Sequence, residues 1–263
     1  MSRKRRTVAD EPFLVIRTTQ GPVKAGQRVN DHNHGWHQLA SVSAGLMTVR
    51  TEAGSWVAPP RWAIWIPAEV RHDIRFVCDS IMESLYVRPG AFAVPEKCTA
   101  LAVSPLLREL ILRAADIGML DSRDPVETAL ATLIAAEFTQ ADVPPFTLPQ
   151  PTSHPTRLAA AMMADGDARA DNLTSLARAV GQSLRTLERQ FLDETRMTIG
   201  QWRRHQALLR GLESLAAGDT IKGATDVAGY AAPSAFIAAF GKAFGTTPGR
   251  YFARPLSELA EAP

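Results

Sequence analysis

The sequence predicts an α+β protein of two domains: an antiparallel β-barrel with a helical pair, followed by an all-α domain. Three observations predict this division. Short β-branched and aromatic runs fill the first ninety residues, apolar residues then recur at helical spacing, and a proline-rich stretch separates the two parts. The chain has 263 residues, which suits about two domains at roughly 150 residues each.

We expect the barrel over residues 11–92. Gly, Pro, Asn or Asp separate its strand-like runs at close spacing, a pattern typical of small antiparallel sandwiches and barrels. The runs are Phe13–Ile16, Leu39–Val42, Leu46–Thr51, Ser55–Ala58, Ala63–Ile66, Asp73–Val77 and Ser84–Val87. From Ser104 the spacing becomes helical and predicts a helical pair over residues 104–141, whose second helix opens at Asp124-Pro125. Barrel and pair together form a first domain over residues 7–142.

A second domain is expected over residues 156–254. Five prolines within residues 143–155 predict a semi-rigid linker before it. Residues 154–254 hold 13 basic and 9 acidic side chains, whereas residues 7–153 hold 12 and 16. A basic second domain beside an acidic first domain indicates that the second one contacts a polyanion.

Cysteine content and hydropathy predict a cytoplasmic protein with no membrane partner. Cys78 and Cys98 are the two cysteines, and they do not form a CxxC motif. The apolar run Phe13–Ile16 behind the basic start is too short for a signal peptide, and no run approaches the ~18 apolar residues of a membrane span.

A helix-turn-helix unit is expected over residues 173–191. Leu173, Leu176 and Ala177 begin an amphipathic helix, Gly181 provides the turn, and Ser183 is placed to cap a second helix. On that second helix Arg185 and Arg189 lie opposite the apolar stripe, with Thr186 beside them. Such a face suits major-groove reading, and the alternative is an ordinary solvated basic face.

A second unit of this kind favours DNA binding. Gly229-Tyr230 precede Pro233-Ser234 and a helix whose apolar stripe is Phe236, Phe240 and Phe244. Between the two units, residues 199–217 predict one long helix of about 28 Å. This length is close to the ~34 Å that separates successive major grooves on one face of DNA.

At these residues the sequence resembles the AraC/XylS family of bacterial transcription regulators. The resemblance covers residues 156–253 and rests on LARAVGQSLRTLERQF and GY…PSAFIAAFGKAFGTTPGRYF. It implies that two helix-turn-helix units bind adjacent major grooves. The base-facing positions it implies are Arg185, Glu188 and Arg189 in the first unit, and Ser234, Ala235 and Ala238 in the second. We assign Arg203, Arg204 and Lys242 to phosphate contacts.

Three departures from the family pattern bear on stability. Arg196 stands where the family usually has Gly, and Gly211 stands where the joining helix usually has Ala. Gly223 and Thr225 interrupt the segment before the second unit. Because Gly costs a helix interior about 1 kcal/mol relative to Ala, we expect the helix at residues 221–228 to be frayed.

Histidines mark the candidate site of the first domain. In HNHGWHQ we expect His32 and His34 on one face of a strand, with Gln38 four residues on, and we place His72 at the end of a later strand. We expect His37 to point away from the cavity. The pattern resembles the cupin barrel, with Gln38 replacing a glutamate of its first motif. The run WVAPPRWAIWIPAEVRHDI is similar to a cupin-type AraC subgroup that includes a nitroimidazole-resistance regulator.

We assign His32, His34, Gln38, Trp65 and His72 to a site for a small, largely uncharged aromatic or heterocyclic effector. Three imidazoles and an amide also suit Zn²⁺, Ni²⁺ or Fe²⁺, so a divalent metal at His32, His34 and His72 remains the alternative to a site without a cofactor. Tryptophans in small barrels either line a ligand pocket or belong to the core, and we place Trp65 in the pocket.

Two functions remain at this point. The first is a sequence-specific DNA-binding regulator controlled by an effector, which is not an enzyme; its partners would be an operator, RNA polymerase if it activates, and a second copy in a homodimer. The second is a metal-dependent cupin enzyme with an accessory helical domain. Against the enzyme stand Gln38 and the lack of an HExxH motif, a nucleophile elbow or a P-loop.

Overall fold

The structure is a computed structural model that describes residues 12–60, 62–138, 147–165, 172–245 and 247–252. The chain divides into two compact units. The first comprises Met1–Thr51 and Trp56–Phe146, and the second comprises Glu52–Ser55 and Thr147–Pro263. Most of the expected proline-rich linker before Thr147, and the last residues of the expected helical pair, lie outside the described residues.

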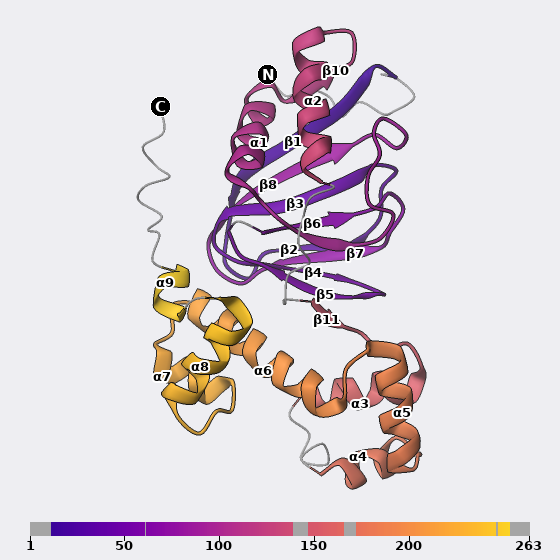
Figure 1. Ribbon diagram of the computed structural model, residues 1–263, viewed down its shortest axis with the longest axis vertical. Helices are drawn as coiled ribbons and strands as arrows, with labels where there is room; N and C mark the ends of the chain where they lie inside the picture. The colour runs from indigo at the N-terminus through magenta and orange to yellow at the C-terminus, as the bar shows by residue number, and fades with distance from the viewer. Residues whose placement is uncertain (1–11, 61, 139–146, 166–171, 246, 253–263) are drawn as a thin grey trace. The chain divides into compact units, whose positions relative to one another are not determined.

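The first unit is built from two antiparallel sheets, which confirms the predicted barrel (Figure 1). One sheet has the order β10-β1-β8-β3-β6-β9, and the other places β5, β4, β7 and β2 side by side. The strands are β1 (Leu14–Val23), β2 (Arg28–His32), β3 (His37–Ala44), β4 (Met47–Thr51), β5 (Gly54–Ala58), β6 (Trp62–Ile66), β7 (His72–Phe76), β8 (Ser80–Val87), β9 (Thr99–Ala102) and β10 (Met119–Asp121).

This unit has two hydrophobic cores, because successive side chains of each strand point to opposite faces of the sheet. The inner face of the strands carries Val42, Ile64, Ile74 and Phe76 in one buried cluster. The opposite face of the first sheet carries residues such as Leu85 and packs against the helical pair. A residue's place in the strand alternation therefore decides whether it faces the barrel interior or the helices.

The helical pair forms as the sequence predicts. α1 (Pro105–Ile117) is capped by the Ser104 hydroxyl, which accepts a hydrogen bond from the Leu107 N–H. α2 (Pro125–Glu137) is capped by the Asp124 carboxylate. Their buried residues include Ile111 on α1 and Ile134 on α2, both in the cluster that covers the sheet.

The second unit is helical apart from the short strand β11 (Thr147–Pro149). Its helices are α3 (His154–Ala164), α4 (Leu173–Ala179), α5 (Leu184–Thr195), α6 (Ile199–Ala216), α7 (Ile221–Val227), α8 (Pro233–Phe244) and α9 (Pro248–Phe252). α6 is the predicted long helix, with a Thr198–Gln201 capping box at its start. No helix in the described part of the chain combines the length and apolar character needed to cross a bilayer.

The strand-like runs expected from the sequence do not include β2, because its sequence RVNDH is polar and lacks an apolar alternation. One local prediction is wrong. The helix at residues 221–228 is not frayed: α7 forms with a Thr220 cap. Ala224 and Thr225 are buried there, and the Thr225 hydroxyl donates to the Ile221 carbonyl at 2.7 Å. Tertiary packing thus outweighs the low helix propensity of Gly223.

Candidate functional site

The first helix-turn-helix unit consists of α4 and α5 joined at Gly181, whose φ is 74°. The Asn172 side chain caps α4, and the Ser183 hydroxyl accepts the Thr186 N–H to cap α5. Leu176, Ala177, Leu187 and Phe191 are buried between the helices and fix their crossing. Their positions match the apolar stripes expected from the sequence.

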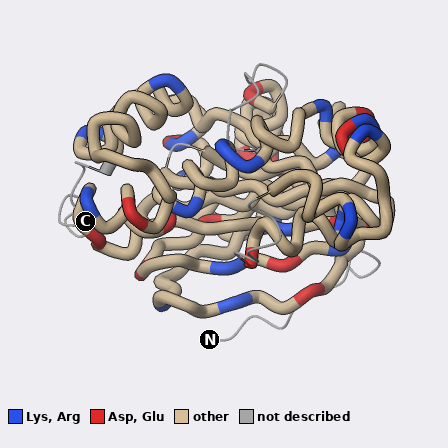
Figure 2. The backbone as a smooth tube through the Cα atoms, turned by 90° about the horizontal axis from the view of Figure 1, so that it is seen from below, with Lys and Arg blue, Asp and Glu red and all other residues tan. Residues whose placement is uncertain are grey.

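The outer face of α5 presents the residues predicted to read DNA. Arg185, Glu188 and Arg189 are exposed, and Thr186 is half-buried with its hydroxyl 2.8 Å from the Ser183 hydroxyl. At the start of α6, Arg204 is exposed and Arg203 is half-buried. Figure 2 colours the backbone blue at Lys and Arg and red at Asp and Glu, and neither colour is confined to one segment.

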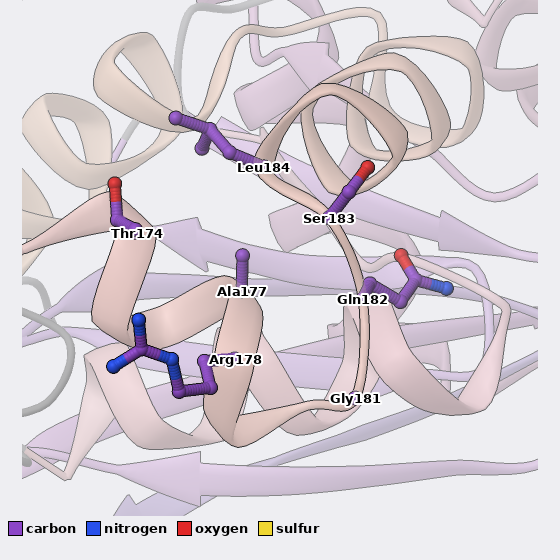
Figure 3. A pocket seen from close by; sticks show the side chains of 7 residues that line it. All are labelled: Thr174, Ala177, Arg178, Gly181, Gln182, Ser183 and Leu184. Atoms are coloured by element: carbon purple, nitrogen blue, oxygen red, sulfur yellow. The ribbon is translucent and has the colours of Figure 1, made fainter.

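A pocket of about 360 Å³ lies at the turn between α4 and α5. Figure 3 shows the Arg178 guanidinium and the Thr174 hydroxyl on its α4 side and Ser183 at the start of α5. Gln182 donates to Gln190 Oε1 at 2.9 Å. Sequence analysis did not assign this pocket, and the signal for it was Arg178 near the end of the first helix. Its lining residues are Thr174, Ala177, Arg178, Gly181, Gln182, Ser183 and Leu184.

The second helix-turn-helix unit consists of α7 and α8. Phe236 and Phe240 are fully buried, whereas Ser234, Ala238 and Lys242 are exposed on the opposite side of α8. α8 also packs closely on α6, because a Cβ atom added to Gly211 would lie 2.5 Å from Phe236 Cε2. Gly211 is therefore required by this contact. The 18 residues of α6 extend about 27 Å between the two units.

In the barrel unit, His32, His34 and His72 come together. One ring nitrogen from each lies within 4.8 Å of the others, and the ring centroids are 4.3–5.6 Å apart. Gln38 completes the group, since its Oε1 lies 3.1 Å from His34 Nε2 and 3.2 Å from His72 Nε2. We call these four residues the imidazole cluster.

The strand positions of the cluster differ from the prediction. His32 ends β2 and His34 lies in the loop before β3, so the two do not share a strand face. His72 begins β7 rather than ending a strand, and it pairs with His32 across the sheet. The cluster is therefore assembled by pairing of β2 with β7 and by the loop.

Backbone carbonyls orient all three imidazoles. His32 Nδ1 lies 2.9 Å from the Asn30 carbonyl, His34 Nδ1 lies 2.7 Å from the Trp36 carbonyl, and His72 Nδ1 lies 2.9 Å from the Val70 carbonyl. A carbonyl only accepts, so each Nδ1 carries the proton. In the neutral ring, each Nε2 then offers a lone pair.

Burial keeps the centre of the cluster uncharged. His72 is buried, and this desolvation lowers its pKa to about 4, with the nearby His32 and His34 acting in the same direction. The Val70 carbonyl and Asp31 raise this pKa and offset part of the effect. His72 is therefore neutral near pH 7 and keeps its Nε2 lone pair.

Trp65 does not belong to the cluster. It is fully buried on the opposite face of the sheet, where it stacks with His37 at 5.3 Å and donates from Nε1 to the Pro95 carbonyl at 2.8 Å. Since Trp65 pairs with Leu39 of β3, it faces the helices rather than the interior. This corrects its assignment to the effector site.

Sequence analysis missed two neighbours of the cluster. Gln38 Nε2 donates to the Ser84 hydroxyl at 3.0 Å, and the Tyr86 ring lies 5.3 Å from the His34 ring. Ser84 and Tyr86 lie two residues apart on β8, so both face the interior. Only the pairing of β8 with β3 reveals this, because the two strands are far apart in the sequence.

Comparisons with known proteins agree with this architecture. A helix-turn-helix domain family matches residues 176–254. The chain is 34% identical over 224 residues to the HTH-type transcriptional regulator NimR of Escherichia coli (strain K12), covering 85% of this chain and 82% of that protein. It is 31% identical over 105 residues to the HTH-type transcriptional regulator RipA of Corynebacterium glutamicum, covering 40% of this chain and 32% of that one.

A structural comparison finds the DNA-binding domain of the global transcriptional factor AdpA in complex with a target DNA. Its TM-score is 0.36 at 22% identity, over 42% of this chain and all of that one. The family assignment rests on NimR, because the shared identity extends over most of both chains. With its two helix-turn-helix units joined by α6, the chain belongs to the AraC/XylS family of DNA-binding transcriptional regulators.

Proposed function

We propose that this regulator is controlled by a small molecule that binds at the imidazole cluster of the barrel. The observation that carries the proposal is the convergence of three imidazoles and one amide on a single point of the interior. The expected effector is aromatic or heterocyclic, since hydrogen-bonding ring compounds suit a site of imidazole and amide groups. The protein would act in the cytoplasm, where its operator lies.

On the DNA side, we assign base reading to Arg185, Glu188 and Arg189. Their exposure on a capped recognition helix supports this role. Phosphate contacts are assigned to Arg203, Arg204 and Lys242, and Ser234 keeps the base-facing position that the family resemblance implies. Thr186 lies beside the arginines on α5, and its N–H donates to the Ser183 hydroxyl at the start of that helix. The pocket beside α5 adds a further basic side chain, Arg178.

The sensing proposal is tested by reporter assays on single variants. His34→Ala and His72→Ala each remove an imidazole from the cluster, so both variants should lose most of the effector response. His37→Ala is the matched control, because His37 lies on the other face of β3 against Trp65. Full responses in both cluster variants would place the effector elsewhere.

A divalent metal ion is the second candidate occupant. As oriented, Gln38 Oε1 faces two imidazole Nε2 lone pairs, an arrangement that a cation stabilises. Ligands about 2.1 Å from a tetrahedral Zn²⁺ lie about 3.4 Å apart, so the residues fit with a small contraction. The metal would supply positive charge that fixes the imidazoles and binds an electron-rich effector atom.

Without a metal, hydrogen bonds from the Gln38 amide can satisfy the Nε2 atoms of His34 and His72. If the Gln38 amide is rotated by 180°, its NH₂ group donates to both imidazoles and the Ser84 hydroxyl donates to Oε1. Metal analysis of the purified protein distinguishes the two forms. A metal site predicts about one equivalent in the wild type, loss in His72→Ala, and tighter Zn²⁺ binding in Gln38→Glu because a carboxylate replaces the amide.

We infer that the protein is not an enzyme, in keeping with its regulator relatives. Turnover of candidate substrates by the metal-loaded protein would contradict this inference. We also propose that it forms a homodimer through the helical pair and contacts RNA polymerase if it activates. Large apolar side chains exposed on the pair support the dimer, and light scattering of the full chain tests it. They are Leu106, Val126 and Leu133.

A further inference from the structure

Glu69 lies at the third position of a β-turn over residues 67–70, between β6 and β7. The Val70 N–H closes this turn by donating to the Pro67 carbonyl at 3.3 Å. Glu69 has a φ of 65°, a left-handed conformation that glycine or asparagine adopts most readily at this position of a turn. A glutamate adopts it at a cost in free energy, so contacts made by Glu69 must offset that cost.

The backbone of this turn connects two imidazoles of the cluster. The Glu69 N–H donates to the His34 carbonyl at 2.9 Å. The carbonyl of the next residue, Val70, lies 2.9 Å from His72 Nδ1 and orients that ring. A rotation about the N–Cα bond of Glu69 would turn one of these groups relative to the other, because they lie on opposite sides of that bond. The φ of Glu69 therefore sets how the His34 backbone and the His72 ring face each other.

The side chain of Glu69 contacts the same loop as its N–H. Its Oε2 accepts a hydrogen bond from Asn33 Nδ2 at 3.2 Å. Its Oε1 lies against the backbone of Gly35, where an added Cβ would be 3.3 Å away. Asn33 and Gly35 flank His34 in the sequence. The carboxylate and the N–H of Glu69 thus contact three successive residues of the loop that carries this imidazole.

We propose that Glu69 is a positioning residue of the effector site. Its left-handed conformation holds the His34 backbone and the His72 ring in place for a common ligand, and its carboxylate stabilises that conformation through Asn33 and Gly35. The proposal rests on the sensing role of the imidazole cluster and names the residue that keeps the cluster assembled before a ligand binds. Groups held in place beforehand bind a ligand more tightly, because less conformational freedom is lost on binding.

The tautomers of the imidazoles report their positions in the protein without a ligand. NMR correlation of ring nitrogens with ring protons separates a protonated nitrogen from one with a lone pair, and the sample is the chelator-treated full chain at about pH 8, where imidazole is mostly neutral. In the wild type, we expect carbonyl groups to fix His34 and His72 in the Nδ1–H form. An imidazole that leaves its carbonyl exchanges between two tautomers, so its two nitrogen shifts move toward each other.

Substitutions of Glu69 separate its conformation from its charge, and its exposure means that they leave the buried core unchanged. Glu69→Ala removes the carboxylate but keeps a Cβ that disfavours the left-handed conformation, so the nitrogen shifts of His34 and His72 should move toward averaged values. Glu69→Gly adopts the same φ without a Cβ and should keep the wild-type shifts. Glu69→Gln should also keep them, because its amide oxygen still accepts from Asn33. The internal control is His32, whose Nδ1 faces a carbonyl of β2 instead of the turn.

A residue that only stabilises the fold would give a different result. It would lower the thermal midpoint of Glu69→Ala but leave the ring signals of the folded protein unchanged, and that result would overturn the positioning role. Averaged shifts in the wild type, or equal averaging in all three Glu69 variants, would overturn it as well. Circular dichroism checks that each variant folds. If Glu69→Ala does not fold, Asn33→Ala removes the same side-chain hydrogen bond and should move the His34 shifts in the same direction.

The positioning role of Glu69 and the sensing role of the cluster fail separately, because the spectra are recorded without a ligand. If the ring shifts move in Glu69→Ala while His34→Ala and His72→Ala keep full responses in the reporter assay, the positioning role stands and the sensing role fails. If the two cluster variants lose the response while Glu69→Ala keeps every ring signal, the sensing role stands and the positioning role is overturned.

Discussion

Arg196 ends the first recognition helix in a backbone conformation that is unfavourable for it. Its φ is 58° and its N–H donates to the Leu192 carbonyl at 2.8 Å, as in a left-handed helix cap. Glycine adopts this conformation without a Cβ clash, which explains why the resembling family places glycine here. Arg196→Gly should therefore raise the free energy of unfolding of the helical compact unit, which contains residues 147–252, by about 1 kcal/mol.

Urea denaturation of the full chain measures this change. Asp193→Gly is a matched control, because Asp193 is exposed within the same helix and has ordinary helical geometry. A glycine there should destabilise the unit by up to about 1 kcal/mol. Equal destabilisation by both substitutions would show that the Arg196 conformation carries no strain.

Glu194 anchors the segment that leads into α3. Its Oε2 accepts from the Thr152 N–H at 2.7 Å, the Ser153 N–H at 3.2 Å and the Thr156 hydroxyl at 2.7 Å. Burial raises its pKa, but these hydrogen bonds outweigh burial and hold the pKa of Glu194 below its usual value. The carboxylate form is thus bound more strongly in the folded state.

The sign of the pH dependence follows. Stability from Glu194 is fully present above the unfolded pKa, roughly 4.3, and is lost as the pH falls through the lower folded value. Glu194→Gln should lower the thermal midpoint at pH 7, and the gap from wild type should narrow as the medium is made acidic. Calorimetry of both proteins between pH 7 and pH 3 measures it; a constant gap would contradict the assignment.

Among the elements, α6 and α8 meet at a contact without spare room. The Gly211 Cα lies against Phe236, and an added Cβ would come within 2.5 Å of the ring and 3.2 Å of Ala228 Cβ. Gly211→Ala should destabilise the second helix-turn-helix unit by about 1–3 kcal/mol, despite the better helix propensity of alanine.

Gly223→Ala is the control that shows the effect of helix propensity without the steric clash expected at Gly211. Gly223 is also helical, but the nearest atoms to an added Cβ are at 3.6 Å. That variant should gain up to about 1 kcal/mol. Hydrogen exchange of α6, α7 and α8 in the full chain reports both effects, and a stabilising Gly211→Ala would show that Phe236 moves aside readily.

The two recognition helices differ in what they offer to bases. α5 exposes Arg185, Glu188 and Arg189, whereas α8 exposes Ser234, Ala235, Ala238 and Lys242. Alanine presents no hydrogen-bond donor and contacts at most a thymine methyl group. We therefore expect sequence specificity to lie in the half-site under α5, with the other half-site tolerating change.

Selection from random DNA tests this asymmetry. Arg189→Ala should cost about 1–3 kcal/mol of binding and relax one base position. Ser234→Ala should change selectivity little, because the exposed face of α8 is mostly alanine and discriminates bases weakly even with the Ser234 hydroxyl present. Two equally sharp half-sites one helical turn apart would contradict the prediction.

For the whole molecule, the uneven distribution of charge predicts salt-sensitive DNA binding. Residues 154–254 carry the basic excess, and phosphate contacts release condensed counterions. The logarithm of the association constant should fall with the logarithm of salt concentration, with a slope of several units. Fluorescence anisotropy over a salt series measures it, Arg204→Ala should reduce the slope by about one, and a flat dependence would contradict phosphate binding.

Local sequence signals predicted most of the fold because helices and caps depend on nearby residues. The Ser104, Asp124 and Ser183 caps and the length of α6 follow from residues a few positions apart. The paired helix-turn-helix units and the family resemblance likewise come from contiguous motifs. β2 escaped prediction because its hydrogen bonds to β7, rather than its composition, make it a strand.

The sequence by itself determined the two-domain division, the apolar and polar faces of α5 and the identity of all four residues of the imidazole cluster. Residue spacing and residue type were enough for these. Only the tertiary structure decided which side chains share the barrel interior. Strand pairing separated Trp65 from the imidazole cluster and brought Ser84 and Tyr86 to it. The reason is physical: each strand directs alternate residues to opposite faces, so a register shift of one residue exchanges interior and exterior, and register is set by partners distant in the chain.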